Sequence, residues 1–270
     1  MAMKPLAPAD RLAPLRAATP ARIFLPSAGA AVATRANLDF SLAHARARDA
    51  VERPLDAAAL AEELRARDLN AVYVESAAAD RRAYLARPDL GRRLKGASRQ
   101  LLADLSEESD IAFVVADGLS AGAVMAHAVP LLDAVLAMYH ADCWKIGPVA
   151  LVRQGRVAIG DEIGEILKAR LVAVLIGERP GLSTPESLGV YLTFSPRIGR
   201  TDAERNCLSN IHTRGMSYAE AAQRLFFLSK QARQRKISGV ELKDESEASA
   251  APPHGLPDEG VTRRSLDGGS

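Results

Sequence analysis

The sequence predicts an α/β protein in which a Rossmann-like domain with a parallel sheet follows a small helical N-terminal domain. From about residue 107, short apolar runs alternate with helical segments, which is typical of a parallel sheet covered on both faces. Residues 36–95 instead read as helical and contain few strand-like runs. We therefore expect a flexible segment over residues 1–20, a mainly helical domain over 21–95, an α/β domain over 96–243 and a disordered tail over 244–270.

Five apolar runs are expected to form the strands, because each is short and rich in Val, Ile, Leu or aromatic residues. They are Ile111–Ala116, Val149–Val152, Val157–Ile159, Leu171–Ile176 and Tyr191–Phe194.

The helices are predicted from helix-forming residues and from capping residues at their ends. Residues 56–67 are rich in Ala, Leu, Glu and Arg, which are good helix formers. Further helices are expected over Pro130–Tyr139 with proline in the first turn, over Asp161–Ala169 with acids in the first turn, from Ser183 to Glu186 onwards, and over Ser217–Lys236 after a capping box.

The turn from Gly177 to Leu182 is the most informative feature of the chain. It follows the buried strand predicted over Leu171–Ile176 and carries one acid, Glu178, beside one base, Arg179. Ligands of open α/β sheets bind outside the carboxyl ends of the strands. We therefore expect Glu178 to lie at a ligand site.

Bulk composition excludes several classes of function. The chain has 270 residues and a net charge of +2, which is too small to indicate nucleic-acid binding, and only 4% of its residues are aromatic. No uninterrupted apolar run has the ~18 residues of a membrane span. Cys143 and Cys207 are far apart, so they make no metal-ligand spacing and fit a reduced cytoplasmic compartment.

Residues 118–122 read G-x-S-x-G after a strand, which is the context of a hydrolase nucleophile. His212 and Asp161 would complete a triad with Ser120, so a serine hydrolase is one hypothesis. We favour the alternative, in which Ser120 caps the next helix, because no His-Gly-Gly oxyanion loop precedes it.

Two further charged groups are ambiguous. Asp161, Glu162 and Glu165 suggest a metal, but a solvated acidic helix N-terminus is the more common arrangement. Arg92–Lys95 is either a phosphate-binding or a solvated basic turn. We predict no metal site.

The surroundings of Cys207 are unusually polar. Arg205, two asparagines, Ser209 and His212 lie within eight residues, which favours a ligand-facing loop over plain core.

Several segments together resemble the small subunit of ethanolamine ammonia-lyase, in its order, from about Ala18 to Lys243. The matching pieces are Tyr84–Leu94, Asp117–Ser120, Gly155–Val157, Asp161–Leu167, Gly177–Leu182, Glu186–Leu188, Ser195–Arg197 and Cys207–His212.

The resemblance implies that the chain pairs with a larger barrel subunit in a hetero-oligomer and that adenosylcobalamin is held at their junction. The absence of a D-x-H-x-x-G motif agrees with a cofactor that keeps its own base on cobalt. Carried over by motif, the cofactor contacts are Val157, Glu178 and Cys207, in the domain over 96–243.

In this family a cofactor radical converts ethanolamine to acetaldehyde and ammonia, and the substrate residues lie on the large subunit. We therefore expect no catalytic residue in this chain, and neither nucleic acid nor membrane as a partner. The implied location is the cytoplasm, with a bacterial microcompartment left open. An assembly subunit without a ligand remains an alternative.

Overall fold

The computed structural model describes residues 12–19, 21–25 and 27–246. The flexible segment and the tail that the sequence predicts therefore lie largely outside the described residues. The helices are α1 Ala13–Ala17, α2 Thr34–Glu52, α3 Ala57–Arg65, α4 Arg81–Ala86, α5 Gly96–Asp104, α6 Ala121–Ala141, α7 Ile159–Ile166 and α8 Tyr218–Arg235, with 3-10 turns at Leu90–Arg92, Asp202–Glu204 and Gly239–Glu241. The strands are β1 Ser27–Ala28, β2 Ala31–Val32, β3 Ala71–Glu75, β4 Ser109–Ala116, β5 Val149–Arg153, β6 Ala169–Gly177, β7 Leu188–Phe194 and β8 Arg205–Ile211.

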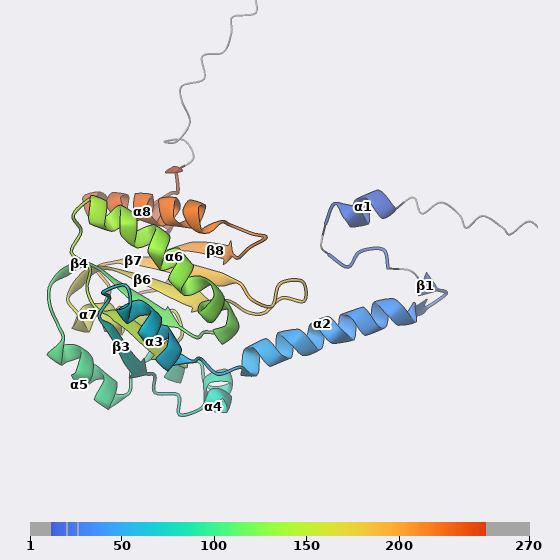
Figure 1. The fold of residues 1–270 in the computed structure, drawn as a ribbon, viewed down its shortest axis with the longest axis horizontal. Helices are drawn as coiled ribbons and strands as arrows, with labels where there is room; N and C mark the ends of the chain where they lie inside the picture. The colour runs from blue at the N-terminus through green and yellow to red at the C-terminus, as the bar shows by residue number, and fades with distance from the viewer. Residues whose placement is uncertain (1–11, 20, 26, 247–270) are drawn as a thin grey trace, which may run out of the picture.

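The centre of the molecule is a six-stranded sheet in the order β3-β5-β4-β6-β7-β8 (Figure 1). The strands β3, β5, β4 and β6 are parallel, whereas β7 and β8 are antiparallel to their neighbours. The α/β class is therefore confirmed, and the sheet is mixed rather than wholly parallel. A parallel crossover needs a dozen or more residues, and the link from Gly177 to Leu188 has only ten residues between them, without a helix. The helix predicted to start at Ser183–Glu186 is wrong.

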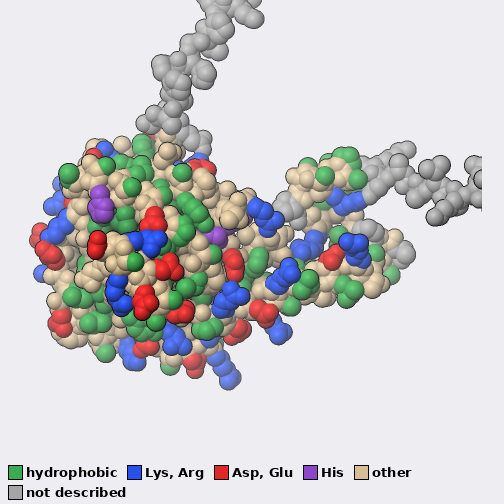
Figure 2. Space-filling view, in the orientation of Figure 1, with side chains coloured by type: hydrophobic (Ala, Val, Ile, Leu, Met, Phe, Trp, Pro, Cys, Tyr) green, Lys and Arg blue, Asp and Glu red, His purple; other side chains and the backbone are tan. Residues whose placement is uncertain are grey.

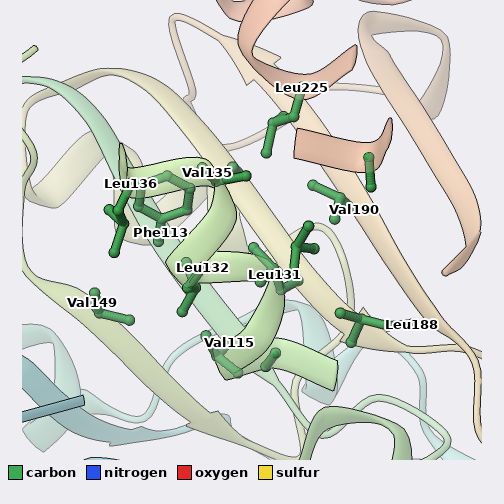
Figure 3. Close-up of a cluster of buried hydrophobic side chains, with 14 of the residues drawn as sticks. Phe113, Val115, Leu131, Leu132, Val135, Leu136, Val149, Leu188, Val190 and Leu225 are labelled. Atoms are coloured by element: carbon green, nitrogen blue, oxygen red, sulfur yellow. The ribbon is translucent and has the colours of Figure 1, made fainter. Parts of the chain in front are cut away.

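Helices α3, α6 and α8 cover one face of the sheet and enclose the larger core. Figure 3 shows α6 lying across the strands, with Leu131, Leu132 and Val135 directed toward Phe113, Val115 and Leu225. Helices α5 and α7 cover the other face, mainly over β3, β5, β4 and β6, and α7 reaches the start of β8 through the Asp161–Arg205 salt bridge. Beyond that contact, no helix among the described residues covers β7 and β8 on this second face, and this stretch is called the open face below.

Helix α6 begins earlier than the sequence predicts. Ser120 caps its N-terminus by accepting a hydrogen bond from the backbone of Ala123, so Pro130 lies inside the helix instead of at its start. Proline removes one helical hydrogen bond, but the apolar faces on both sides of Pro130 are buried in the core and hold the helix together. Helix α6 is long and apolar enough to cross a membrane, yet 61% of that stretch is buried inside the protein.

The N-terminal part is helical as predicted for α2, α3 and α4, but β3 was missed. It pairs in parallel with β5 over five residues and belongs to the main sheet. Helix α2 extends away from the sheet, and Figure 2 shows basic, acidic and apolar side chains interspersed along it and over the sheet domain. Only Ala43 and Ala50 of α2 are buried.

Candidate functional site

The carboxyl ends of β4 and β6 are locked together by glycines. Gly118, just after β4, has a φ of +55°, and a Cβ there would lie 2.3 Å from the carbonyl oxygen of Gly177. The backbone N–H of Leu119 donates to that same carbonyl at 2.9 Å. Because only glycine fits this contact, the turn after β4 fixes the residue that follows β6, and that residue is Glu178.

Glu178 lies directly after a central strand, as the sequence predicts, and its carboxylate is held through one oxygen. Oε2 accepts a hydrogen bond from the hydroxyl of Ser187 at 2.6 Å and one from the backbone N–H of Asn210 at 3.2 Å. A bulge in β8 directs that N–H at Glu178 instead of β7, and Asn210 has a φ of +63°. Within the described ranges, no group donates to Oε1 and no cation forms a salt bridge with Glu178.

The side chain of Glu178 lies over Gly189 on β7. A Cβ on Gly189 would come within 3.0 Å of Oε1. Glycine at this position therefore leaves the space in which the carboxylate lies, at the border of the open face.

Tyr191 and Cys207 lie opposite each other on β7 and β8, so their side chains are neighbours on the same face of the sheet. Burial of the phenol, together with the nearby Cys207 and Glu178, raises the pKa of Tyr191. Desolvation, together with the Glu178 carboxylate, raises the pKa of the Cys207 thiol. Both groups are therefore neutral at pH 7, and Cys207 is not a reactive thiolate. Cys207 lies on a strand and not on the loop that the sequence predicts.

Val157 lies in the turn before α7 and not in a strand, so the strand predicted over Val157–Ile159 is wrong. The preceding turn is anchored by Tyr84, whose ring lies 4.2 Å below the Arg156 guanidinium and whose hydroxyl donates to the carbonyl of Gly155 at 3.2 Å. These contacts force a turn where the residue types favour a strand. Val157 and Tyr191, both partly exposed, pack against the core of the second face.

The acidic cluster on α7 is mostly buried, so its predicted solvated face is wrong for two of three acids. Asp161 forms a two-pronged salt bridge with Arg205 at 2.5 and 2.7 Å, and both side chains are at most 3% exposed. Glu162 accepts the backbone N–H of Leu94 at 2.7 Å and pairs with Arg99. Only Glu165 is exposed. The acids fasten α7 to its neighbours, and the described part of the chain has no group of three metal-ligating side chains.

The hydrolase triad does not form. Ser120 is fully buried, caps α6 and donates its hydroxyl to the carbonyl of Pro185 at 3.2 Å. The ring nitrogens of His212 bond to Asn210 and to the backbone of Arg214. Asp161 is engaged by Arg205. Ser120 is thus a structural cap, as the sequence favours.

Comparison with known proteins decides the family. The family model described as ethanolamine ammonia-lyase light chain (EutC) matches residues 9–243. The ethanolamine ammonia-lyase small subunit of Azotobacter vinelandii is 55% identical over 239 residues, which cover 87% of this chain and 88% of that protein. The small subunit of Pseudomonas aeruginosa is 54% identical over 88% of this chain and 88% of that protein. The small subunit of Xanthomonas campestris pv. campestris is 54% identical over 89% of this chain and 90% of that protein.

The chain belongs to the ethanolamine ammonia-lyase small-subunit family. Of the three residues carried over from this family by motif, the structure brings Glu178 and Cys207 together around Tyr191, while Val157 lies at the edge of the same core. The arrangement has one free acceptor, one neutral thiol and one aromatic ring on a helix-free part of the sheet. It is suited to binding a ligand, and it lacks the paired base that nucleophilic catalysis requires.

Sequence reasoning missed Ser187, Gly189, Tyr191 and Asn210 as members of this site. Period-two alternation within the run from Leu188 to Phe194 would have placed Gly189 and Tyr191 on one face. Nothing in the sequence indicates that Asn210 donates to Glu178, because that contact depends on the bulge in β8.

Proposed function

We propose that this chain is the small subunit of an adenosylcobalamin-dependent ethanolamine ammonia-lyase and that its open face holds one side of the cofactor. The family supports the lyase and a larger partner subunit. The observation that carries the cofactor role is Oε1 of Glu178, a solvent-accessible acceptor without a donor from the described residues at the border of the open face. Because Oε1 is open to solvent and receives no donor from the described residues, it is free to accept a hydrogen bond from a ligand.

The residues present fit a corrin. The corrin ring has an apolar rim and carboxamide side chains, whose N–H groups are donors. Oε1 of Glu178 accepts such a donor, and the rings and methyl groups of Tyr191 and Val157 offer apolar surface. The neutral thiol of Cys207 is small and polarizable, so it packs against a flat ligand without introducing a charge.

In this proposal the two subunits and the cofactor have separate roles. When bound, adenosylcobalamin supplies the radical that converts ethanolamine to acetaldehyde and ammonia. Ethanolamine is bound by the large, barrel-shaped subunit. The residues of this chain orient the corrin and exclude water from it, and none of them moves a proton. The complex works in the cytoplasm, with the interior of a bacterial microcompartment as a further setting.

The experiment is a spectrum of the co-purified complex. This chain is expressed with the large subunit, loaded with adenosylcobalamin and passed through a desalting column. Retained corrin absorbance and ethanolamine turnover by the complex, with neither from this chain alone, are the expected results. A stable two-subunit complex that retains no corrin would instead favour an assembly subunit without a ligand.

A further inference from the structure

The two oxygens of Glu178 have different roles. Oε2 is occupied by the hydroxyl of Ser187 and the N–H of Asn210, while Oε1 lies over Gly189 without a donor. Since these two bonds and the space above Gly189 fix the side chain, the protein presents one defined oxygen atom toward the open face.

That oxygen carries charge that nothing nearby neutralises. A carboxylate accepts hydrogen bonds and donates none. In the part of the chain that the structure describes, the carboxylate of Glu178 contacts the Ser187 hydroxyl and the Asn210 N–H and has no salt-bridge partner. Its neighbours Tyr191 and Cys207 are neutral, because burial raises the pKa of both groups.

We propose that Glu178 is a specificity-determining residue that selects corrins with a carboxamide, and rejects those with a carboxylate, at the side chain facing it. This inference rests on the proposed function and adds a preference among cofactor forms. A carboxamide donates an N–H to Oε1, whereas a carboxylate at the same place has no donor and repels the Glu178 charge. Ser187 and Gly189 are positioning residues, because they fix which oxygen is presented.

The test uses adenosylcobalamin and its monocarboxylate isomers, each with one corrin amide hydrolysed. Binding to the assembled two-subunit complex is followed by the change in corrin absorbance, without ethanolamine. For the wild type, one isomer is expected to bind about 10-fold or more weakly than adenosylcobalamin, in line with loss of a hydrogen bond to a charged group. This difference in affinity between the isomer and adenosylcobalamin is called the affinity gap. In Glu178→Gln the affinity gap closes, because the glutamine amide donates a hydrogen bond to the isomer's carboxylate.

Two variants keep the result interpretable. Glu108→Gln removes one charge from an exposed acid next to the amino end of β4, so it leaves the gap unchanged. Gly189→Ala places a Cβ 3.0 Å from Oε1 and shifts the carboxylate, so the gap narrows even if Glu178→Gln assembles poorly.

Wild-type complex that binds every isomer as tightly as adenosylcobalamin would overturn the inference. An affinity gap that persists unchanged in Glu178→Gln would also overturn the inference, because a residue other than Glu178 would then recognise the corrin side chain. Failure of the wild-type complex to bind adenosylcobalamin itself would refute the proposed function, and the two failures are thereby distinguished.

Discussion

Replacing Glu178 with glutamine should weaken cofactor binding and leave the fold intact. Both protein donors to the side chain, from Ser187 and Asn210, bind Oε2. A glutamine keeps those two bonds only by turning its carbonyl oxygen toward them, which places its NH₂ group where Oε1 was. An acceptor facing the cofactor thus becomes a donor, and the bond from a cofactor N–H is lost.

The expected loss is that of one hydrogen bond to a charged group, about 1.5–3 kcal/mol. It corresponds to a roughly 10- to 150-fold weaker affinity for adenosylcobalamin, and the lower end applies if the cofactor amide can turn its carbonyl toward the glutamine. Turnover at saturating cofactor should fall less, because the radical chemistry belongs to the cofactor.

The assay is a titration of the reconstituted complex, followed by corrin absorbance, with Glu108→Gln as the charge-matched control. Unfolding of Glu178→Gln is measured in parallel, to show that the variant is folded. An unchanged affinity in a folded, assembled complex would refute the reasoning and remove Glu178 from the site.

Three further outcomes are expected. Asp161→Asn leaves the buried Arg205 charge with Asp202, an exposed carboxylate 3.4 Å away, as its ionised partner, and it should lower the free energy of unfolding by about 3–5 kcal/mol, as measured with urea. Asp202→Asn removes the second salt-bridge partner of Arg205, whose side chain is 96% exposed, and should change the free energy of unfolding by less than about 1 kcal/mol. If the two variants lost the same free energy, burial would not explain the strength of the Asp161–Arg205 pair. Ser120→Ala should lose about 1 kcal/mol through its helix cap and keep ethanolamine turnover, whereas complete loss of turnover in a folded complex would contradict a purely structural role for Ser120. The isolated chain should show no lyase activity, and it should aggregate because α2 exposes Leu38, Phe40 and Leu42. Leu38→Asp should therefore raise the solubility of the isolated chain in a sedimentation assay. Unchanged solubility would show that α2 does not cause the aggregation.

The sequence predicts the part of the fold that local pattern determines. The run Leu171–Ile176 is apolar without interruption because β6 is buried on both faces, and a glycine turn ends it, so both the strand and the position of Glu178 could be predicted. The cap at Ser217 likewise places α8. In both cases the signal lies within about ten neighbouring residues.

Longer-range contacts account for most of what was missed. Residues 157–159 have strand-forming side chains, yet the packing of Tyr84 on Arg156 holds a turn just before them. The acids of α7 look solvated in sequence because their partners, Arg205 and Leu94, lie more than 40 residues away. The antiparallel direction of β7 and the bulge in β8 arise from pairing across the sheet, which no single segment encodes.

The central claim is that adenosylcobalamin covers the open face next to Cys207. The chain has two free cysteines, both exposed, and Cys143 lies just after the end of α6, outside the proposed site. The most direct measurement is the rate at which a thiol reagent labels each cysteine in the assembled complex, with and without cofactor. It is made at mildly alkaline pH, because partial desolvation of the sulfur and the nearby Glu178 carboxylate raise the pKa of the Cys207 thiol. We expect the cofactor to slow labelling of Cys207 and to leave Cys143 unchanged. An equal rate at Cys207 with and without bound cofactor would contradict the claim.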